Sequence, residues 1–205
     1  MKYDPDIHHR RSIRLRGYDY SSAGAYFVTI CTQGREYLFG DIVDGAMYLN
    51  GAGQMVAEWW SKLPDKFPGV MLDEYVIMPN HFHGIIVITG TVGAPPCGCP
   101  GSPAPCGCPS LHTTSKSGRP HGAGSNGRPH GAAPTVGDIM DWFKTMTTNA
   151  YIAGVKQSGW PPFPGRLWQR NYYERIIRDD GELSGIREYI RLNPVKWADD
   201  NENPN

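Results

Sequence analysis

Residues 79–88, Pro-Asn-His-Phe-His-Gly-Ile-Ile-Val-Ile, constrain the fold of this chain more than any other stretch. The apolar, β-branched run over 85–88 lacks helical spacing and predicts a β-strand. Side chains alternate across a strand, so His81 and His83 share one face while Phe82 points to the other. Two neighbouring imidazoles can bind one metal ion, although surface histidines with no joint role would show the same spacing.

The apolar patterns elsewhere predict an α+β fold. Their order is strand, helix, strand, strand, helix, strand, as in a ferredoxin-like antiparallel sheet with helices packed on one face. In that arrangement the strand with the two histidines pairs at the sheet centre, and the open face suits single-stranded nucleic acid. The expected elements are strand 25–32, a hairpin near 37–49, helix 52–63, strands 70–78 and 82–88, helix 136–155, a strand within 167–177 and helix 182–193.

Length and charge limit the classes of protein that fit. The 205 residues allow one main domain, and 20 Lys+Arg balance 20 Asp+Glu, so no overall field indicates a nucleic-acid partner. Basic residues gather in an arm over 1–17 and in the stretch 166–196, where phosphate contact and a solvated surface both remain open. No apolar run approaches the roughly 20 residues of a membrane span, and the start of the chain lacks a signal-peptide core. A cytoplasmic protein is therefore expected.

The stretch 91–134 differs in composition from everything around it. It is rich in Gly, Pro, Ser and His, and the units Pro-Cys-Gly-Cys-Pro and Gly-Arg-Pro-His-Gly-Ala each recur after nine residues. Such a segment cannot bury enough apolar surface to order itself, which predicts a disordered insertion within a main domain over 18–197. An acidic tail over 198–205 completes the expected organisation. The cysteines of the insertion could bind zinc, but they lack the usual zinc spacing: Cys97, Cys99, Cys106 and Cys108.

The expected last helix carries a second group of candidate site residues. Tyr189 and Asn193 are four residues apart and share one helix face, and Pro194 indicates that Asn193 lies on the last turn. A helix that ends against the histidine strand would bring a phenol and an amide oxygen to one point. A core tyrosine and an asparagine that stops the helix would give the same sequence, so both interpretations stay open.

Three separated motifs resemble the REP-associated tyrosine transposases, relatives of the single-tyrosine HUH transposases of bacterial insertion sequences. They are Met-Pro-Asn-His-Phe-His at 78–83, Leu-Trp-Gln-Arg-Asn-Tyr-Tyr-Glu-Arg-Ile-Ile-Arg at 167–178 and Tyr-Ile-Arg-Leu-Asn-Pro-Val-Lys at 189–196. The resemblance spans residues 18–92 and 133–197 and implies a fold of the HUH-nuclease type. The insertion at 91–134 departs from the short connection that is usual in the family.

By that resemblance His81 and His83 bind a divalent metal, Mg²⁺ or Mn²⁺, and Asn193 is the third ligand. Tyr189 is then the nucleophile of a metal-dependent, site-specific single-strand DNA endonuclease and strand transferase. The resemblance implies that such an enzyme cuts hairpin-forming DNA, including repetitive extragenic palindromes, through a covalent 5′-phosphotyrosine. No Gly-rich loop for a nucleotide cofactor is present in the sequence, and a nucleoid-associated bacterial protein is expected.

Tyr172 and Tyr173 are alternative nucleophiles, although neighbours in a strand face opposite ways, so only one of them could reach the site. Two other functions also remain open. One is a non-catalytic ferredoxin-like module that binds single-stranded nucleic acid, and the other is a metallohydrolase that activates water. The residues expected to contact DNA are Arg170, Tyr172, Arg175, Arg178, Arg187 and Arg191.

Overall fold

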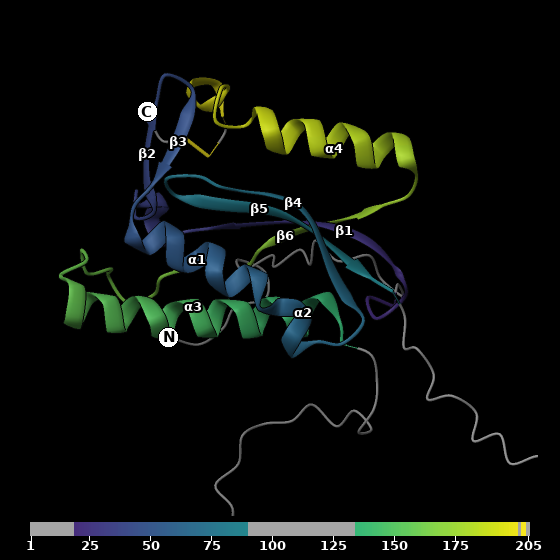
Figure 1. Cartoon of the computed structure of the whole chain (residues 1–205), viewed down its shortest axis with the longest axis horizontal. Coiled ribbons are helices and arrows are strands. Elements are labelled where there is room, and N and C mark those ends of the chain that lie inside the picture. The colour runs from purple at the N-terminus through teal and green to yellow at the C-terminus, as the bar shows by residue number, and fades with distance from the viewer. Residues whose placement is uncertain (1–18, 90–133, 201, 204–205) are drawn as a thin grey trace, which may run out of the picture. The chain divides into compact units, whose positions relative to one another are not determined.

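The computed structural model describes residues 19–89, 134–200 and 202–203 and builds them around one antiparallel sheet (Figure 1). The sheet has the order β4-β5-β1-β6, with β5 paired to β4 on one side and to β1 on the other. This order confirms the expected α+β fold with a ferredoxin-like sheet, and the histidine strand is central as predicted. The four strands are β1 (Gly24–Cys31), β4 (Val70–Ile77), β5 (His81–Ile88) and β6 (Tyr173–Ile177).

Three helices cover one face of the sheet and enclose the main core (Figure 1). Trp60 from a helix, Phe82 from β5 and Phe143 from a second helix meet there, with ring centroids 4.6–5.6 Å apart. Phe82 lies in this core, fully buried, as the alternation of β5 predicted. Aromatic side chains bury large apolar areas, so this cluster anchors β5 from below. The helices are α1 (Gly51–Ser61), α2 (Leu63–Lys66) and α3 (Val136–Ser158).

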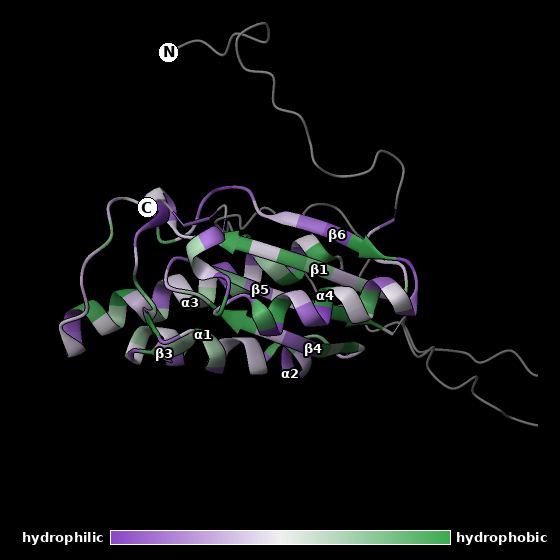
Figure 2. Cartoon of the chain, turned by 90° about the horizontal axis from the view of Figure 1, so that it is seen from above, coloured by the Kyte–Doolittle hydropathy of each residue, from purple (hydrophilic) through white to green (hydrophobic). Residues whose placement is uncertain are grey.

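The remaining helix, α4 (Asp180–Leu192), lies on the opposite face of the sheet (Figures 1 and 2). This position corrects the expectation that all helices pack on one face. Ile190 of α4 packs against Phe27, Ile85 and Ile177 in a second, smaller apolar cluster. The reason is that β1 and β5 carry apolar side chains on both faces, and a sheet that is apolar on both faces needs cover on both. Figure 2 shows the hydrophobic character of β1.

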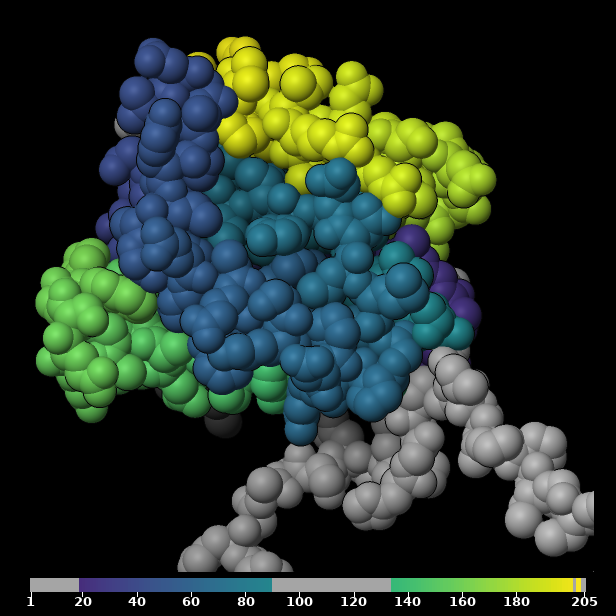
Figure 3. Space-filling model, viewed as in Figure 1, coloured from purple at the N-terminus to yellow at the C-terminus, as the bar shows by residue number. Residues whose placement is uncertain are grey.

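Two further features border the α4 face. A hairpin of β2 (Gly40–Val43) and β3 (Ala46–Leu49) confirms the hairpin expected near 37–49. There are also two short 3-10 turns. The first, η1 (Gln33–Arg35), follows β1, and the second, η2 (Trp197–Asp199), follows α4. In the space-filling view the hairpin and the chain at the end of α4 lie side by side above the central strands (Figure 3).

The stretch 198–205 is not a separate acidic tail where the structure describes it. Glu202 accepts a hydrogen bond from Asn80 through its backbone carbonyl, and its carboxylate lies 3.0 Å from the Arg35 guanidinium. The Tyr37 hydroxyl also donates to Asn203. The folded domain therefore continues past residue 197, because the acidic side chains and carbonyls of this segment find donors next to β5.

Three other expectations concern boundaries. The strand expected within 167–177 begins only at Tyr173, while Trp168 forms an isolated bridge to Thr32. The arm 1–17 lies outside the described residues, as does the insertion 91–134 except for its last residue.

Within the described part of the chain, no helix combines the length and the apolar character that crossing a bilayer requires.

Candidate active site

A cavity of about 400 Å³ opens on the α4 face of the sheet. Residues from β1, β5, β6, α4 and the segment after α4 line it. Among them are His83 from β5, Tyr189 and Asn193 from the end of α4, and Asp200 from beyond η2. The structure thus brings the predicted nucleophile and two of the predicted metal ligands to one place.

His81 and His83 lie next to each other on the α4 face of β5. Both are buried, and their ring centroids are 4.5 Å apart. Burial lowers the pKa of His81 to about 4, although nearby Asp200 and Glu202 oppose the shift. Burial and the neighbouring His81 also lower the pKa of His83. Both imidazoles are therefore neutral near pH 7, which is the form that binds metal ions.

Asn80 fixes the orientation of the His81 ring. The Asn80 Nδ2 atom donates to the Glu202 carbonyl at 2.7 Å, which turns the amide oxygen toward His81 Nδ1 at 2.8 Å. Because an amide oxygen only accepts hydrogen bonds, Nδ1 carries the proton and Nε2 holds the lone pair. His81 Nε2 is buried and has no hydrogen-bond partner among the described residues. Such a backing hydrogen bond is the usual support of a metal-binding histidine.

His83 has the equivalent support from β1. Its Nδ1 atom lies 2.7 Å from the Thr29 hydroxyl, directly across the strand pair. Its Nε2 atom faces the cavity and lies 3.3 Å from the Tyr189 hydroxyl. Phe27 stacks on the His83 ring with centroids 5.4 Å apart and meets the Tyr189 ring edge-on at 6.0 Å. One side chain of β1 therefore holds both rings in place.

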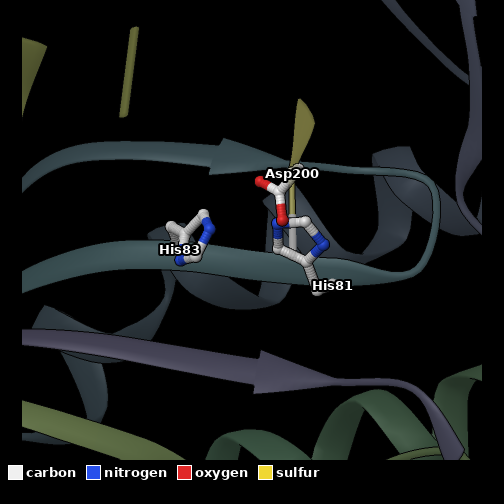
Figure 4. A group of neighbouring side chains, drawn as sticks. All are labelled: His81, His83 and Asp200. Atoms are coloured by element: carbon white, nitrogen blue, oxygen red, sulfur yellow. The ribbon is translucent and has the colours of Figure 1, made fainter. Parts of the chain in front are cut away.

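Asp200 completes a group of three possible metal ligands (Figure 4). The ligand atoms of His81, His83 and Asp200 all lie within 4.8 Å of one another. Asp200 is not among the site residues expected from the sequence, because it falls in a stretch expected to be an acidic tail. The available signal was the acidic cluster of Asp199, Asp200 and Glu202, about ten residues or more beyond Tyr189.

Asn193 lies beside the partly exposed Asp200 and is itself buried. Its Nδ2 atom donates to Asp200 Oδ2 at 3.0 Å, while its Oδ1 atom has no hydrogen-bond partner in the described part of the chain. A buried polar atom without a partner is costly unless a ligand satisfies it. The unpartnered Asn193 oxygen and His81 nitrogen, together with a carboxylate, therefore fit a divalent cation that accepts mixed nitrogen and oxygen ligands.

The Tyr189 phenol is half-exposed at the mouth of the cavity, with 45% of its surface accessible. Partial burial raises its pKa, and the neighbouring Asp200 and Glu202 carboxylates raise it further, while the Asn193 side chain lowers it. With these residues alone around it, the phenol is protonated at neutral pH. Attack on a phosphate by this oxygen therefore requires nearby positive charge.

The two adjacent tyrosines at the start of β6 point to opposite sides of the sheet, as expected for neighbours in an extended chain. Tyr173 lines the cavity, and its ring lies edge-on to Phe27 with centroids 6.5 Å apart. Tyr172 packs instead against the main core on the other side of the sheet. Tyr173 is thus the one of the pair that borders the candidate site.

The arginines expected to contact DNA do not gather at this cavity. Arg187 forms an ion pair with Asp73, and Arg191 forms one with Glu74, both at a register shift in β4. Arg175 pairs with Glu182 of α4. These ion pairs attach α4 to the domain, whereas Arg178 is exposed and Arg170 lines a different cleft. Among the described residues that line the cavity, Lys196 is the positively charged side chain.

Comparison with solved structures shows that this fold is similar to that of a tyrosine transposase. The structure of a REP-associated tyrosine transposase bound to a REP hairpin matches with a TM-score of 0.51 and 18% sequence identity, over 90% of this chain and 73% of that one. No protein-family model matches the chain. An uncharacterized protein of Haemophilus influenzae is 40% identical over 204 residues, which cover 97% of this chain and 96% of that protein. The chain belongs to the same family as the Haemophilus influenzae protein.

Proposed function

We propose that this protein is a transposase-like, metal-dependent endonuclease and strand transferase that cuts single-stranded DNA through Tyr189. The observation that carries the proposal is the position of the Tyr189 hydroxyl, 3.3 Å from His83 Nε2 in the cavity that also holds Asp200. A nucleophile beside a group of metal ligands is the arrangement that phosphoryl transfer needs.

The proposed step is an exchange of phosphodiester bonds. The Tyr189 oxygen attacks phosphorus and loses its proton, the bond between phosphorus and the 3′ oxygen breaks, and that oxygen takes up a proton as a free 3′-hydroxyl. The 5′-phosphate stays on the tyrosine as a phosphotyrosine. Because the new ester keeps the energy of the old one, the released or another 3′-hydroxyl can reverse the step and join strands without a nucleotide cofactor.

His81, His83, Asp200 and the Asn193 oxygen would hold the divalent cation, Mg²⁺ or Mn²⁺. A cation bound there supplies positive charge to the non-bridging phosphate oxygens. The chain itself supplies the preorganisation: Asn80 and Thr29 fix the two rings, and Phe27 fixes Tyr189 relative to His83. In this proposal Asp200 joins the ligand set, with Asn193 either as a fourth ligand or as a support for the carboxylate.

DNA that forms hairpins is the proposed partner, and repetitive extragenic palindromes are the proposed targets. The structural neighbour supports this, because its solved complex contains a REP hairpin. The sheet edge beside the cavity carries Tyr173, 43% exposed, which offers a flat ring for a base. We further propose that the catalytic domain runs from residue 18 to at least 203, with 91–134 as a dispensable insertion, in a cytoplasmic, nucleoid-associated protein.

A denaturing gel tests the proposed function. The protein is incubated with Mn²⁺ and a 3′-labelled single strand that carries a palindromic repeat, because the fragment with the 3′ end is the one that stays on Tyr189. A covalent protein–DNA adduct is expected, and Tyr189→Phe should abolish it while Tyr173→Phe keeps it. Cleavage without an adduct would instead favour the metallohydrolase, and binding without cleavage would favour the non-catalytic module. An adduct that survives Tyr189→Phe and disappears in Tyr173→Phe would reassign the nucleophile.

A further inference from the structure

A second cleft, of about 590 Å³, lies between α3 and the segment that leads from α3 to β6. It is on the side of the sheet that faces away from α4, because α3 and Leu167 belong to the main core. Lys144 of α3 and Arg166 and Arg170 of the connecting segment line it, against one carboxylate, that of Asp141. The cleft is thus locally basic in a chain whose total charge is balanced.

The wall of this cleft is fixed by hydrogen bonds. Lys144 Nζ donates to the backbone carbonyls of Gln169 at 2.7 Å and Arg170 at 3.0 Å. Trp168 Nε1 donates to the Thr147 hydroxyl at 2.8 Å, and both side chains are buried. These bonds attach residues 168–170 of the connecting segment to α3. The two arginines therefore project from a defined backbone rather than from a loose loop.

The positive charges of the cleft are not neutralised within the described part of the chain. Neither Arg166 nor Arg170 forms an ion pair there, whereas Arg175, Arg187 and Arg191 all do. Partial burial lowers the pKa of Lys144, and the nearby Arg166 lowers it too, while Asp141 opposes them. Like charges that repel one another around a cavity favour an anionic ligand.

The cleft reaches the candidate active site along the chain. Arg170 lines the cleft and Tyr173 lines the catalytic cavity, so the two are separated by residues 171–172. Three peptide units span at most about 11 Å. Successive phosphates of a nucleic-acid strand are a few Å apart, so a strand that passes over the start of β6 would bridge the two sites within a few nucleotides.

We propose that this basic cleft is a second nucleic-acid-binding site, which holds backbone phosphates of the strand whose scissile phosphate lies at Tyr189. The inference rests on the proposed function for the identity of the strand. The ligand class is the phosphodiester backbone itself, because guanidinium groups bind phosphate oxygens with paired N–H donors and do so without reading sequence.

Fluorescence anisotropy with labelled oligothymidylate tests the cleft. Two lengths are compared, one of about 6 nucleotides and one of about 25, because a single site of this kind covers roughly 4–16 nucleotides. The variants are Arg166→Gln, Arg170→Gln and the double variant, with Lys66→Gln on α2 as a control that removes one exposed charge elsewhere. Melting temperatures show whether each variant folds.

The double variant should bind the long oligonucleotide more weakly. The slope of log K against log salt should fall by about 0.7 for each phosphate that the variant no longer neutralises. The affinity of the double variant for the short oligonucleotide should change little. The affinity of Lys66→Gln for the long oligonucleotide should also change little. Wild-type affinity and slope in a folded double variant would overturn the proposal, as would an equal decrease in affinity in Lys66→Gln.

The adduct assay separates this proposal from the proposed function. If wild-type protein forms the adduct and the double variant binds long DNA normally, the cleft proposal alone fails. If wild-type protein forms no adduct but the double variant binds the long strand more weakly, the cleft binds nucleic acid and the proposed function fails.

Discussion

Arg187 of α4 donates hydrogen bonds from Nε and Nη2 to the two carboxylate oxygens of Asp73 on β4, and the Nε–Oδ1 distance is 2.9 Å. Arg187 precedes Tyr189 by two residues, so this fork fixes the end of α4 that presents the nucleophile. Asp73→Asn and Arg187→Gln should each lower the rate of adduct formation about tenfold, because small displacements of a nucleophile are costly in rate. Single-turnover kinetics at saturating DNA measure this effect.

A double-mutant cycle provides the control. If Arg187 acts through Asp73, the double variant should be little less active than either single variant. Strictly additive effects would mean that Arg187 acts independently of Asp73, as a contact with DNA would require.

The Asp73–Arg187 pair should also make stability depend on pH. The Arg187 guanidinium lowers the pKa of Asp73 below its usual value, with the Glu74 backbone amide as a further donor. The stabilising contribution is therefore fully present above about pH 4, the unfolded pKa, and is lost as pH falls through the lower folded pKa. The difference in melting temperature between wild type and Asp73→Asn should be constant from neutral pH to about pH 5 and shrink below about pH 4. A difference at pH 3 as large as that at pH 7 would contradict this.

The sequence predicted most of the fold, because the spacing of apolar residues in β1, β5 and α3 can be read from positions that are close together in the chain. It also predicted that His81 and His83 share one face of a strand and that Tyr189 lies on the last helix, since strand alternation and helix spacing are local patterns. It could not place α4, because the choice of sheet face depends on apolar residues of β1 and β5 that are distant in sequence. The position of α4 also explains why two arginines expected to contact DNA instead form ion pairs. Arg187 and Arg191 pair with carboxylates of β4 that are more than 100 positions away in the sequence.

Asp200 shows a second limit of sequence reasoning. Its approach to the histidines depends on a 3-10 turn after α4 and on contacts of the following residues with Asn80 and Arg35. No periodic pattern encodes such a turn. The motif Pro-Asn-His contains Asn80, but the motif alone does not show what this side chain does. Its role follows from the hydrogen bond of the Asn80 side-chain amide to Glu202, which turns the amide oxygen toward His81.

Asn80→Ala should weaken metal binding without touching a ligand. The variant removes the acceptor that orients His81 Nδ1, so the ring can rotate and change tautomer. Loss of such a backing partner typically costs about 10- to 100-fold in metal affinity. Titration calorimetry with Mn²⁺ measures the change, and melting temperature shows whether removal of the bond to Glu202 unfolds the segment. Unchanged Mn²⁺ affinity in a folded variant would remove Asn80 from the site.

Gly84 tests the packing that supports β5. A Cβ atom at this position would lie 2.6 Å from the Trp60 ring, so Gly84→Ala forces an overpacked core and should cost about 1–3 kcal/mol of stability. Gly185 of α4 is the matched control, because a Cβ there meets nothing within 4 Å. Gly185→Ala should stabilise the protein by about 0.5–1 kcal/mol through helix propensity. Chemical denaturation measures both, and similar stability in the two variants would contradict the packing argument.

Asp200 and its neighbour Asp199 offer the sharpest test of the metal ligands. Both line the cavity, but only Asp200 lies within 4.8 Å of the ligand atoms of His81 and His83. Asp200→Asn keeps the shape of the side chain and removes the charge, so Mn²⁺ affinity should fall by at least about tenfold, as expected for removal of a carboxylate ligand or its support. Asp199→Asn removes the same charge one residue away and should change Mn²⁺ affinity much less. Equal decreases in the two variants would mean that the segment attracts the cation only through its net charge, and Asp200 would then not be a ligand.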